Sequence, residues 1–315
     1  MKEENMSNEL LNEYRRVAYY YYKVGLTQDA IAKKLKISRQ RINRIVSACV
    51  RLGIVKITIE GLEQCNLELE ANLEQKYGLR EVRIIDSVNE ADLIETLGAE
   101  AGNWLKSFVS SGDIIGVTRG RATAKMVENL HVSSLNAENL TVTQLIGSAK
   151  ESETQMGVDN MVYRLAEKLH AKAEILYAPV IVASDEAKNA YMEDVFCKET
   201  YSVMKNCTIA VVGIGTAQSQ WKHMVALYDK DDAEQSRWAE NVVGEVCTHF
   251  YDKDGNEVEP PFRNRIISIA LKDYKNIPLR VGIAGGAEKV DAIRAALTGG
   301  YINALITDAE TAKLL

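Results

Sequence analysis

The sequence lacks the features of several protein classes. Its five cysteines are odd in number, widely spaced and without a CxxC pair, which argues against a disulfide framework or a zinc finger. Its four histidines show no HxxxH or HExxH spacing, so we expect no metal site and no cofactor. No stretch approaches the roughly 18 apolar residues of a membrane helix, and MKEENMSNEL does not resemble a signal peptide. We therefore expect a cytoplasmic protein with no membrane partner.

The 315 residues are enough for two or three domains with a large core, and 46% of them are apolar. Charge is unevenly distributed along the chain. Residues 1 to 60 contain twelve cations and six acids, a net +6, so the total of −6 leaves −12 for residues 61 to 315. A basic segment joined to an acidic body favours phosphate binding at one end of the chain only.

The segment from Thr27 to Val55, TQDAIAKKLKISRQRINRIVSACVRLGIV, predicts a helix-turn-helix. Thr27 and Ser38 are candidate N-caps of two helices, and Lys36 and Ile37 form the corner between them. The apolar stripe of the second helix comprises Ile42, Ile45, Val46 and Cys49 or Val50.

The opposite face of the second helix is polar and basic, as in a helix that reads DNA. An ordinary solvated surface would give a similar pattern, but the charge asymmetry favours DNA. The predicted DNA contacts are Thr27, Gln28, Ser38, Arg39, Gln40, Arg41, Asn43 and Arg44.

The segments on either side complete this unit. Residues 8 to 23 predict a first helix ended by Gly25, in which most of the four consecutive tyrosines are core or edge residues rather than base-stacking groups. Residues 54 to 60 alternate as a short strand and predict a wing. We thus expect a winged helix-turn-helix domain over residues 1–60. The helix predicted over residues 62 to 77 could pack on the body or on a second copy.

Residues 61–315 predict an α/β domain with a mostly parallel sheet, because apolar strands alternate with helical segments. The predicted strands are 81–85, 114–117, 140–146, 174–177, 208–212, 266–270, 279–284 and 304–307, and the predicted helices are 90–107, 120–129, 160–170 and 288–297.

Three of these strands are followed by short segments rich in glycine and small polar residues, where parallel sheets bind ligands. Glycine after a strand is also common turn chemistry, but three such segments together favour a ligand site. GVTRGRAT (116–123) suits a phosphate at a helix N-terminus. GIGT (213–216) lets the backbone approach a ligand closely, and GGAEK (285–289) supplies a lysine. Glu245 is either an acceptor for sugar hydroxyls or a structural acid.

The sequence resembles the SorC family of bacterial transcriptional regulators over almost its whole length. The resemblance is carried by YYYYKVGLTQDAIAKKLKISRQRINRIVSACVRLGIVKITI, DIIGVTRGRAT, CTIAVVGIGTA, VVGEVCTHFYDKDGNEV and RVGIAGGAEKVDAIRAALTGGYINALITDAETAKLL. It implies an effector domain similar to sugar-phosphate isomerases and deaminases, a phosphorylated sugar effector, and a homo-oligomer, either a dimer or a tetramer.

Carried over residue by residue, the resemblance assigns the phosphate to the 116–123 loop and Lys289 and the sugar to Glu245, and it places Asp308 in a recurring motif. The predicted effector contacts are Thr118, Arg119, Gly120, Arg121, Thr123, Gly213, Gly215, Thr216, Glu245, Gly285, Gly286 and Lys289. Departures from the family pattern are Arg119 in place of tryptophan, Ala122 in place of threonine, Glu245 in place of aspartate, and Lys36 in place of glycine.

We therefore predict a transcriptional repressor of a carbohydrate operon, with operator DNA and a phosphorylated sugar as partners and with no catalytic residues. The alternatives are a sugar-phosphate isomerase or deaminase and a regulator with an unphosphorylated or nonsugar ligand. The enzyme needs a general base, and no paired carboxylate or histidine with catalytic spacing lies beside the three loops.

Overall fold

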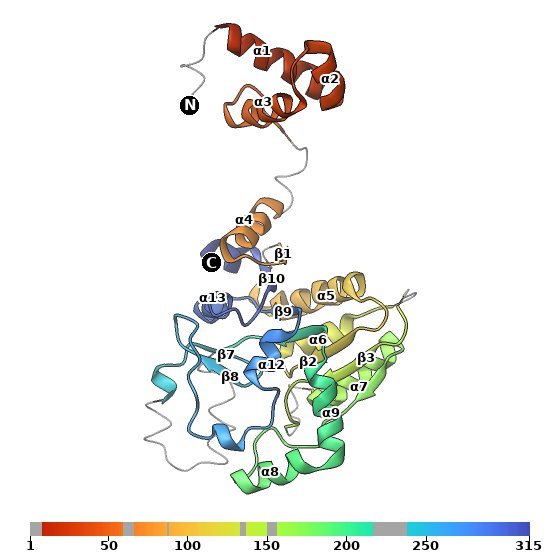
Figure 1. Cartoon of the computed structure of the whole chain (residues 1–315). Coiled ribbons are helices and arrows are strands. Elements are labelled where there is room, and N and C mark those ends of the chain that lie inside the picture. Colours follow the sequence, from red (N-terminus) through yellow and green to blue (C-terminus); the bar gives the residue numbers. More distant parts are fainter. Residues whose placement is uncertain (1–7, 59–65, 87, 133–136, 150–155, 217–237) are drawn as a thin grey trace. The chain divides into compact units, whose positions relative to one another are not determined.

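The chain divides into two units, each built from different secondary structure (Figure 1). The N-terminal unit comprises Met1–Glu63 and the C-terminal unit Gln64–Leu315. The computed structural model describes residues 8–58, 66–86, 88–132, 137–149, 156–216 and 238–315.

Helices form the described part of the N-terminal unit: α1 (Asn8–Ala18), the π-helix η2 (Tyr19–Lys23), α2 (Gln28–Leu35) and α3 (Arg39–Arg51). The predicted first helix therefore changes to π geometry at the tyrosines. Tyr20 and Tyr21 pack against the core of this unit, whereas Tyr19 is 59% exposed. The cluster of buried apolar residues at its core is small and comprises Val17, Ala18, Ile31, Ile42, Ile45, Val46 and Cys49.

The predicted wing strand is wrong over residues 54 to 58, which form no strand, and residues 59 and 60 lie outside the described part. A strand needs a neighbouring strand for its ladder of hydrogen bonds. Ile54 and Val55 instead pack against the helical core, and Val55 N donates to Cys49 O at 3.0 Å. Ile57, the next position of the alternation, is 61% exposed, so the pattern does not mark a buried strand face.

A parallel sheet of seven strands organises the C-terminal unit, in the order β1-β10-β9-β5-β2-β3-β4. Its strands are β1 (Glu81–Ile85), β2 (Ile114–Val117), β3 (Thr141–Gln144), β4 (Lys172–Glu174), β5 (Ile209–Gly213), β9 (Leu279–Ile283) and β10 (Ala304–Asp308). The mostly parallel α/β fold predicted from the alternating pattern is confirmed. In register, Val211 of β5 lies between Val117 of β2 and Val281 of β9, and all three are buried.

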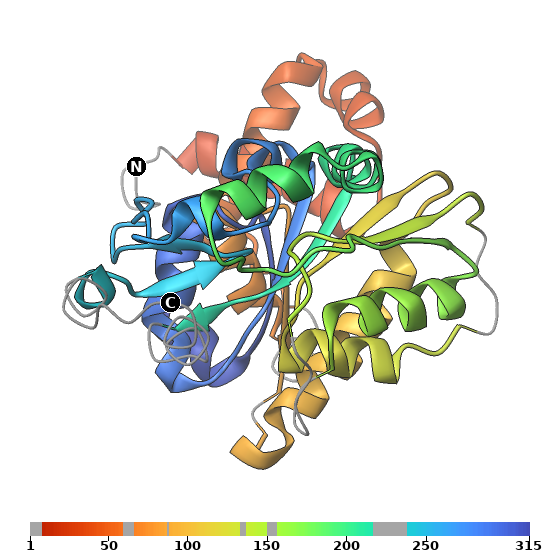
Figure 2. The same cartoon turned by 90° about the horizontal axis from the view of Figure 1, so that it is seen from below.

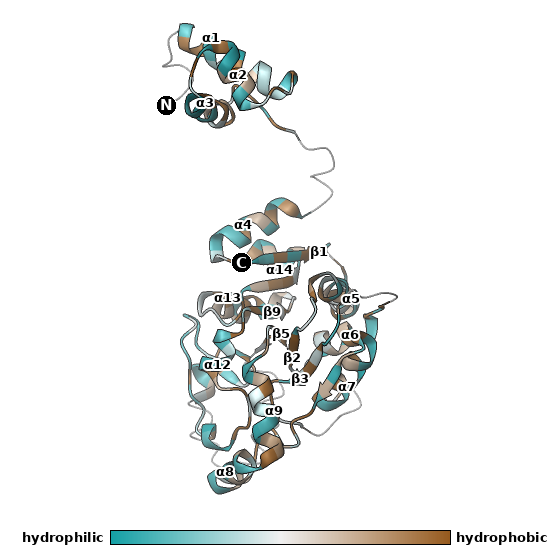
Figure 3. Cartoon of the chain, turned by 45° about the vertical axis from the view of Figure 1, so that its right-hand side comes forward, coloured by the Kyte–Doolittle hydropathy of each residue, from teal (hydrophilic) through white to brown (hydrophobic). Residues whose placement is uncertain are grey.

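Helices cover both faces of this sheet, as the three views agree (Figures 1, 2 and 3). On one face lie α5 (Glu90–Phe108), α6 (Arg121–Asn129) and α7 (Val158–Leu169), and on the other lie α9 (Val195–Lys205), α12 (Leu271–Asn276) and α13 (Val290–Thr298). A small antiparallel sheet of β6 (Gly215–Thr216), β7 (Gly244–Val246) and β8 (His249–Tyr251) packs on α13. The remaining elements are α4 (Leu67–Tyr77), α8 (Asp185–Glu193), the 3-10 turns η4 (Arg263–Arg265) and η5 (Ala287–Lys289), and α14 (Ala309–Leu314).

Helix α4 covers the edge of the sheet at β1 and also contacts α14. Leu73 is buried there, and Leu69 and Tyr77 pack against the same core. The apolar stripe predicted over residues 62 to 77 thus has a partner within the chain, although residues 62 to 65 lie outside the described part.

Two predicted strands agree least with the structure, whereas the others match it or differ from it only at their ends. Residues 266 to 270 form only isolated bridges, in which Ile266 pairs with Ile181 and Ser268 with Ile146. Ile266, Ile267 and Ile269 are nevertheless buried, and a short buried apolar run cannot be distinguished from a strand by periodicity. The strand predicted over 174–177 begins earlier, at Lys172, and ends at Glu174.

Candidate functional site

Side-chain caps fix the two helices of the predicted DNA-binding motif. Thr27 Oγ1 accepts from Ala30 N at 3.2 Å and begins α2, and Ser38 Oγ accepts from Arg41 N at 3.2 Å and begins α3. Between the helices, Lys36 adopts the left-handed conformation, with φ 57° and ψ 41°. With this αL corner, only three residues separate the end of α2 from the start of α3.

The polar face of α3 is exposed, and acids from neighbouring helices position two of its arginines. Arg41 Nη2 lies 2.7 Å from Glu13 Oε2 of α1, and Arg39 Nη1 lies 3.4 Å from Asp29 Oδ2 of α2. The local sequence pattern did not identify Glu13 as a partner, because it lies 28 residues before Arg41.

The other predicted contacts share this face. Gln28 Nε2 donates to Asn43 Oδ1 at 3.4 Å, which joins α2 to α3, and Gln40 and Arg44 are exposed. The structure thus brings all eight predicted DNA contacts together on α2, α3 and their caps.

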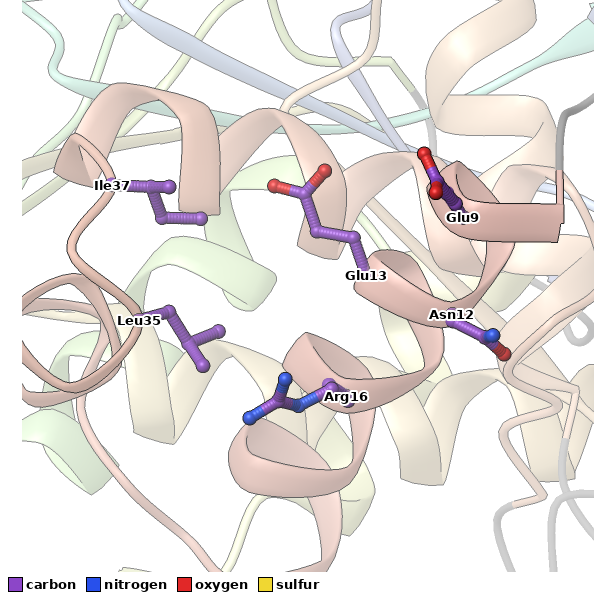
Figure 4. Close-up of a pocket in the computed structure, with 6 residues that line it drawn as sticks. All are labelled: Glu9, Asn12, Glu13, Arg16, Leu35 and Ile37. Atoms are coloured by element: carbon purple, nitrogen blue, oxygen red, sulfur yellow. The ribbon is translucent and has the colours of Figure 1, made fainter.

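A pocket of about 390 Å³ lies beside this face, between α1 and the corner of the motif (Figure 4). Leu35 and Ile37 extend toward it from the corner, and Glu13 and Arg16 extend from α1. The same Glu13 binds Arg41, so this pocket adjoins the polar face of α3.

The three predicted ligand loops follow β2, β5 and β9, which are neighbours in the sheet. Because these strands are parallel, their carboxyl ends lie at the same edge. From β2 the chain continues toward β3 and β4, whereas from β5 it continues toward β9 and β10 on the other side. The loops therefore meet at a change of direction in strand order, where α/β sheets bind ligands.

Hydrogen bonds within the first loop fix its shape. Thr123 is fully buried, and its hydroxyl contacts Thr118 O at 3.0 Å and Gly120 O at 2.9 Å. Thr118 is also buried, and its Oγ1 accepts from Gly213 N at 3.4 Å, which joins this loop to the second one. Arg119 is half-buried, whereas Arg121 is exposed at the start of α6. Arg121 is thus the exposed cation of this loop.

Lys289 lies where the second and third loops meet. Its ammonium donates to Ile214 O at 3.0 Å. Burial lowers the pKa of Lys289 below its ordinary value, and the neighbouring Arg121 lowers it further, whereas Glu288 and Glu245 oppose this shift. Two cations from separate loops therefore repel each other here, and a bound anion would relieve that repulsion.

Glu245 lies opposite Gly215 in the small sheet and is half-buried. A Cβ at Gly215 would lie 2.5 Å from Glu245 Oε1, so a side chain at this position would displace the carboxylate. Thr248 N donates to Glu245 Oε2 at 3.1 Å, from a hairpin turn in which Cys247 and Thr248 have φ of 52° and 66°.

Glycines of the second and third loops have different surroundings. A Cβ at Gly213 would meet nothing within 4 Å, and Thr216 is half-buried in β6. Gly286 has φ 103°, and its N–H already contacts Asp308 Oδ2 at 3.0 Å and Thr311 Oγ1 at 2.8 Å. Gly285 is buried against Asp308.

Asp308 and Thr311 therefore hold the third loop in place by hydrogen bonds to Gly286 N. The sequence pattern did not reveal this role. The recurring position of Asp308 was the one available signal. In the described residues no group of three or more histidine, cysteine or acidic side chains is arranged to hold a metal ion. None of the helices described is both long and apolar enough to cross a bilayer.

Comparison with known proteins gives consistent matches. The family described as "Putative sugar-binding domain" matches residues 63–315. The sorbitol operon regulator of Klebsiella pneumoniae is 31% identical over 303 residues, covering 95% of this chain and 96% of that protein. The transcriptional regulator LsrR of Escherichia coli strain K12 is 28% identical over 318 residues, covering 100% of this chain and 97% of that protein.

Among solved structures, full-length SorC from Klebsiella pneumoniae aligns with a TM-score of 0.73 and 30% identity, covering 98% of this chain and 99% of that one. These relatives are transcriptional regulators, so the enzyme alternative has no support among them.

Proposed function

The chain belongs to the SorC family of transcriptional regulators with a sugar-binding domain, and we propose that it is a repressor of a carbohydrate operon, controlled by a phosphorylated sugar. In this proposal residues 1–60 bind operator DNA through a helix-turn-helix. Residues 61–315 bind the effector, through a domain akin to sugar-phosphate isomerases and deaminases, and form a dimer or tetramer in the cytoplasm.

The observation that carries the effector half is the convergence of Lys289 and Arg121 at the carboxyl edge of the sheet. The chain carries a net charge of −6, yet two cations lie near each other at this edge. They repel each other and together attract an anion. A phosphate dianion suits both cations and the N-terminus of α6.

Glu245 supplies the complementary recognition of the sugar. A carboxylate accepts hydrogen bonds and repels phosphate, so it favours the hydroxyl end of the ligand. Thr248 N donates to Glu245 Oε2, and Oε1 lies beside Gly215 of the second loop, at the start of the small sheet. The name of the sorbitol operon regulator makes sorbitol 6-phosphate a first ligand to test.

A thermal-shift series tests the effector half. We expect sorbitol 6-phosphate, fructose 6-phosphate or ribose 5-phosphate to raise the melting temperature, and unphosphorylated sorbitol to have no such effect. Lys289→Met should weaken this binding about 10- to 100-fold, because a charge-assisted hydrogen bond is lost. The matched control is Lys313→Met, which removes an exposed lysine paired with Glu310 in the same unit. Equal binding by both variants would contradict the assignment of Lys289.

The DNA half rests on the exposed polar face of α3. A duplex selected from a random library with the full chain serves as the probe. Arg44→Ala should weaken its binding by roughly 1 to 3 kcal/mol if Arg44 reads a base, as measured by fluorescence anisotropy. Arg164→Ala removes an exposed arginine of the C-terminal unit and is the control. Unchanged affinity in Arg44→Ala and Arg39→Ala would contradict this use of α3.

Regulation requires the effector to bind the DNA-competent and DNA-incompetent forms with different affinity. Coupling of about 1 to 3 kcal/mol is typical, equal to a 5- to 150-fold change in DNA affinity. Repeating the anisotropy titration with saturating sugar phosphate measures this change. Weaker DNA binding supports a repressor released by its effector, and stronger binding would contradict that sign.

A further inference from the structure

We infer that Asp308, Thr311 and α14 couple the loop that holds Lys289 to helix α4, the first helix after the segment that joins the two units. The inference rests on the proposed function, because it assigns a regulatory route to the same ligand site. It is carried by an unbroken series of contacts within the C-terminal unit.

The series begins in the third loop, where a backbone hydrogen bond joins Lys289 to Gly286. Lys289 N donates to Gly286 O at 3.0 Å, so a displacement of Lys289 by a ligand also displaces Gly286. Gly286 N in turn donates to Asp308 Oδ2 at 3.0 Å and to Thr311 Oγ1 at 2.8 Å. Asp308 and Thr311 are 5% and 1% exposed, so water does not replace these contacts.

Helix α14 carries the series onward. Asp308 is its N-cap, because Oδ1 accepts from Thr311 N at 2.9 Å, while the Thr311 hydroxyl donates to Oδ2 at 2.6 Å. One carboxylate therefore both begins α14 and holds Gly286. A displacement of Gly286 that weakens its bonds to Asp308 and Thr311 changes the N-terminus of α14.

At its other end, α14 leads directly to a contact with α4. Tyr77 OH donates to Leu315 O at 2.7 Å, and Lys76 Nζ donates to the same oxygen. Leu315 is buried, so its position depends on α14 and α4 together.

Helix α4 is also fixed to the free edge of β1. Glu74 Oε1 accepts from Val82 N and Glu70 Oε1 accepts from Ile84 N, each at 2.9 Å. These bonds satisfy edge N–H groups that pair with no strand in the described part of the chain. β1 pairs with β10, and β10 ends at Asp308, the residue that begins α14. Helix α4 therefore contacts both β1 and the residue that follows α14, and both lead back to Asp308.

Amide hydrogen exchange on the full chain tests the coupling without a ligand. Thr311→Val removes the hydroxyl that contacts Gly286 and Asp308 but keeps a branched side chain. We expect exchange to become about tenfold faster in α4 as well as in residues 285–289, the effect of losing a hydrogen bond. Exchange in α9 should stay unchanged, and Thr311→Ser should restore protection in α4.

The matched control is Thr298→Val, because Thr298 Oγ1 contacts only the local helix carbonyl Arg294 O among its described bonds. Tyr77→Phe tests the coupling in the opposite direction, from α4 to the third loop. It should make amide exchange faster at residues 285–289. Its control is Tyr163→Phe, which removes a hydroxyl that contacts Tyr177 at the surface.

The coupling would be overturned if Thr311→Val made exchange faster at residues 285–289 but left exchange in α4 unchanged. It would also be overturned if exchange in α9 became faster by the same factor as in α4. These outcomes are independent of the proposed function. That proposal fails if sugar phosphates do not bind or if Lys289→Met binds them normally, whereas the coupling fails if the loop and α4 respond separately.

Discussion

The two units differ in how each combines charge with packing. The N-terminal unit has a core cluster of seven buried apolar residues and carries several of its cations on the exposed face of α3. The C-terminal unit has a large core around a seven-stranded sheet, and Lys289 and Arg121 lie near each other in it although residues 61–315 carry a net charge of −12. A DNA-facing surface is flat and open, so exposed cations suffice, whereas a small anion is recognised by cations converging from separate loops.

The largest expected effect comes from the small core. Ile42 is fully buried at the centre of the N-terminal unit, and Ile42→Ala should lower the stability of that unit by about 2 to 5 kcal/mol. Because this loss is a large fraction of the stability of so small a unit, the N-terminal unit should unfold at a lower temperature than the C-terminal unit. Calorimetry would then show two transitions and anisotropy a loss of DNA binding, while the sugar-phosphate thermal shift persists.

The control for this variant is Leu97→Ala, a fully buried leucine of the large core. It should lower the melting temperature of the C-terminal unit and leave the helical unit folded. A single common transition in both variants would show that the units unfold together and that their difference in core size has no thermodynamic consequence.

The sequence was most informative where a pattern is local. The caps Thr27 and Ser38 and the buried stripe of α3 follow from spacing within one or two turns, and the structure has them as predicted. The strands β2, β5 and β9 were recognisable as apolar runs, and their glycine-rich ends could be located without knowing the strand order.

Contacts between distant residues were not predictable in this way. Asp308 holds Gly286 across 22 positions, and Glu13 binds Arg41 across 28. The second and third loops become neighbours only because β5 pairs with β9. The wing failed for a related reason, since alternation in residues 54 to 58 does not supply a partner strand.

The pH dependence of ligand binding gives the second prediction. Because the pKa of Lys289 lies below that of an ordinary lysine, its ammonium loses its proton at a lower pH. A phosphate dianion keeps its charge above neutral pH, since its second pKa is about 6. Sugar-phosphate affinity should therefore fall at alkaline pH, beginning at a lower pH than an ordinary lysine would give, toward the value for Lys289→Met.

Titration calorimetry at a series of pH values measures this fall. Lys289→Arg keeps its charge throughout that range and is the control, because its affinity should change much less with pH. Parallel curves for the wild type and Lys289→Arg would contradict the role of Lys289 ionisation.

The smallest expected effect concerns backbone strain. Each unit has a non-glycine residue in the left-handed conformation, exposed in one unit and buried in the other. Lys36 has φ 57° at an exposed corner, whereas Cys247 has φ 52° in a buried turn beside Glu245. Glycine relieves left-handed strain of roughly 1 to 2 kcal/mol but adds freedom to the unfolded chain. Lys36→Gly should thus stabilise the N-terminal unit by about 0.5 kcal/mol.

Cys247→Gly should have the opposite sign, because it also removes a buried side chain and leaves a cavity. Denaturant unfolding of both variants, followed by signals from each unit, compares the two positions. Stabilisation of both would mean that strain outweighs packing in the C-terminal unit as well. Destabilisation by Lys36→Gly would instead show that the Lys36 side chain contributes more to this corner than its backbone conformation costs.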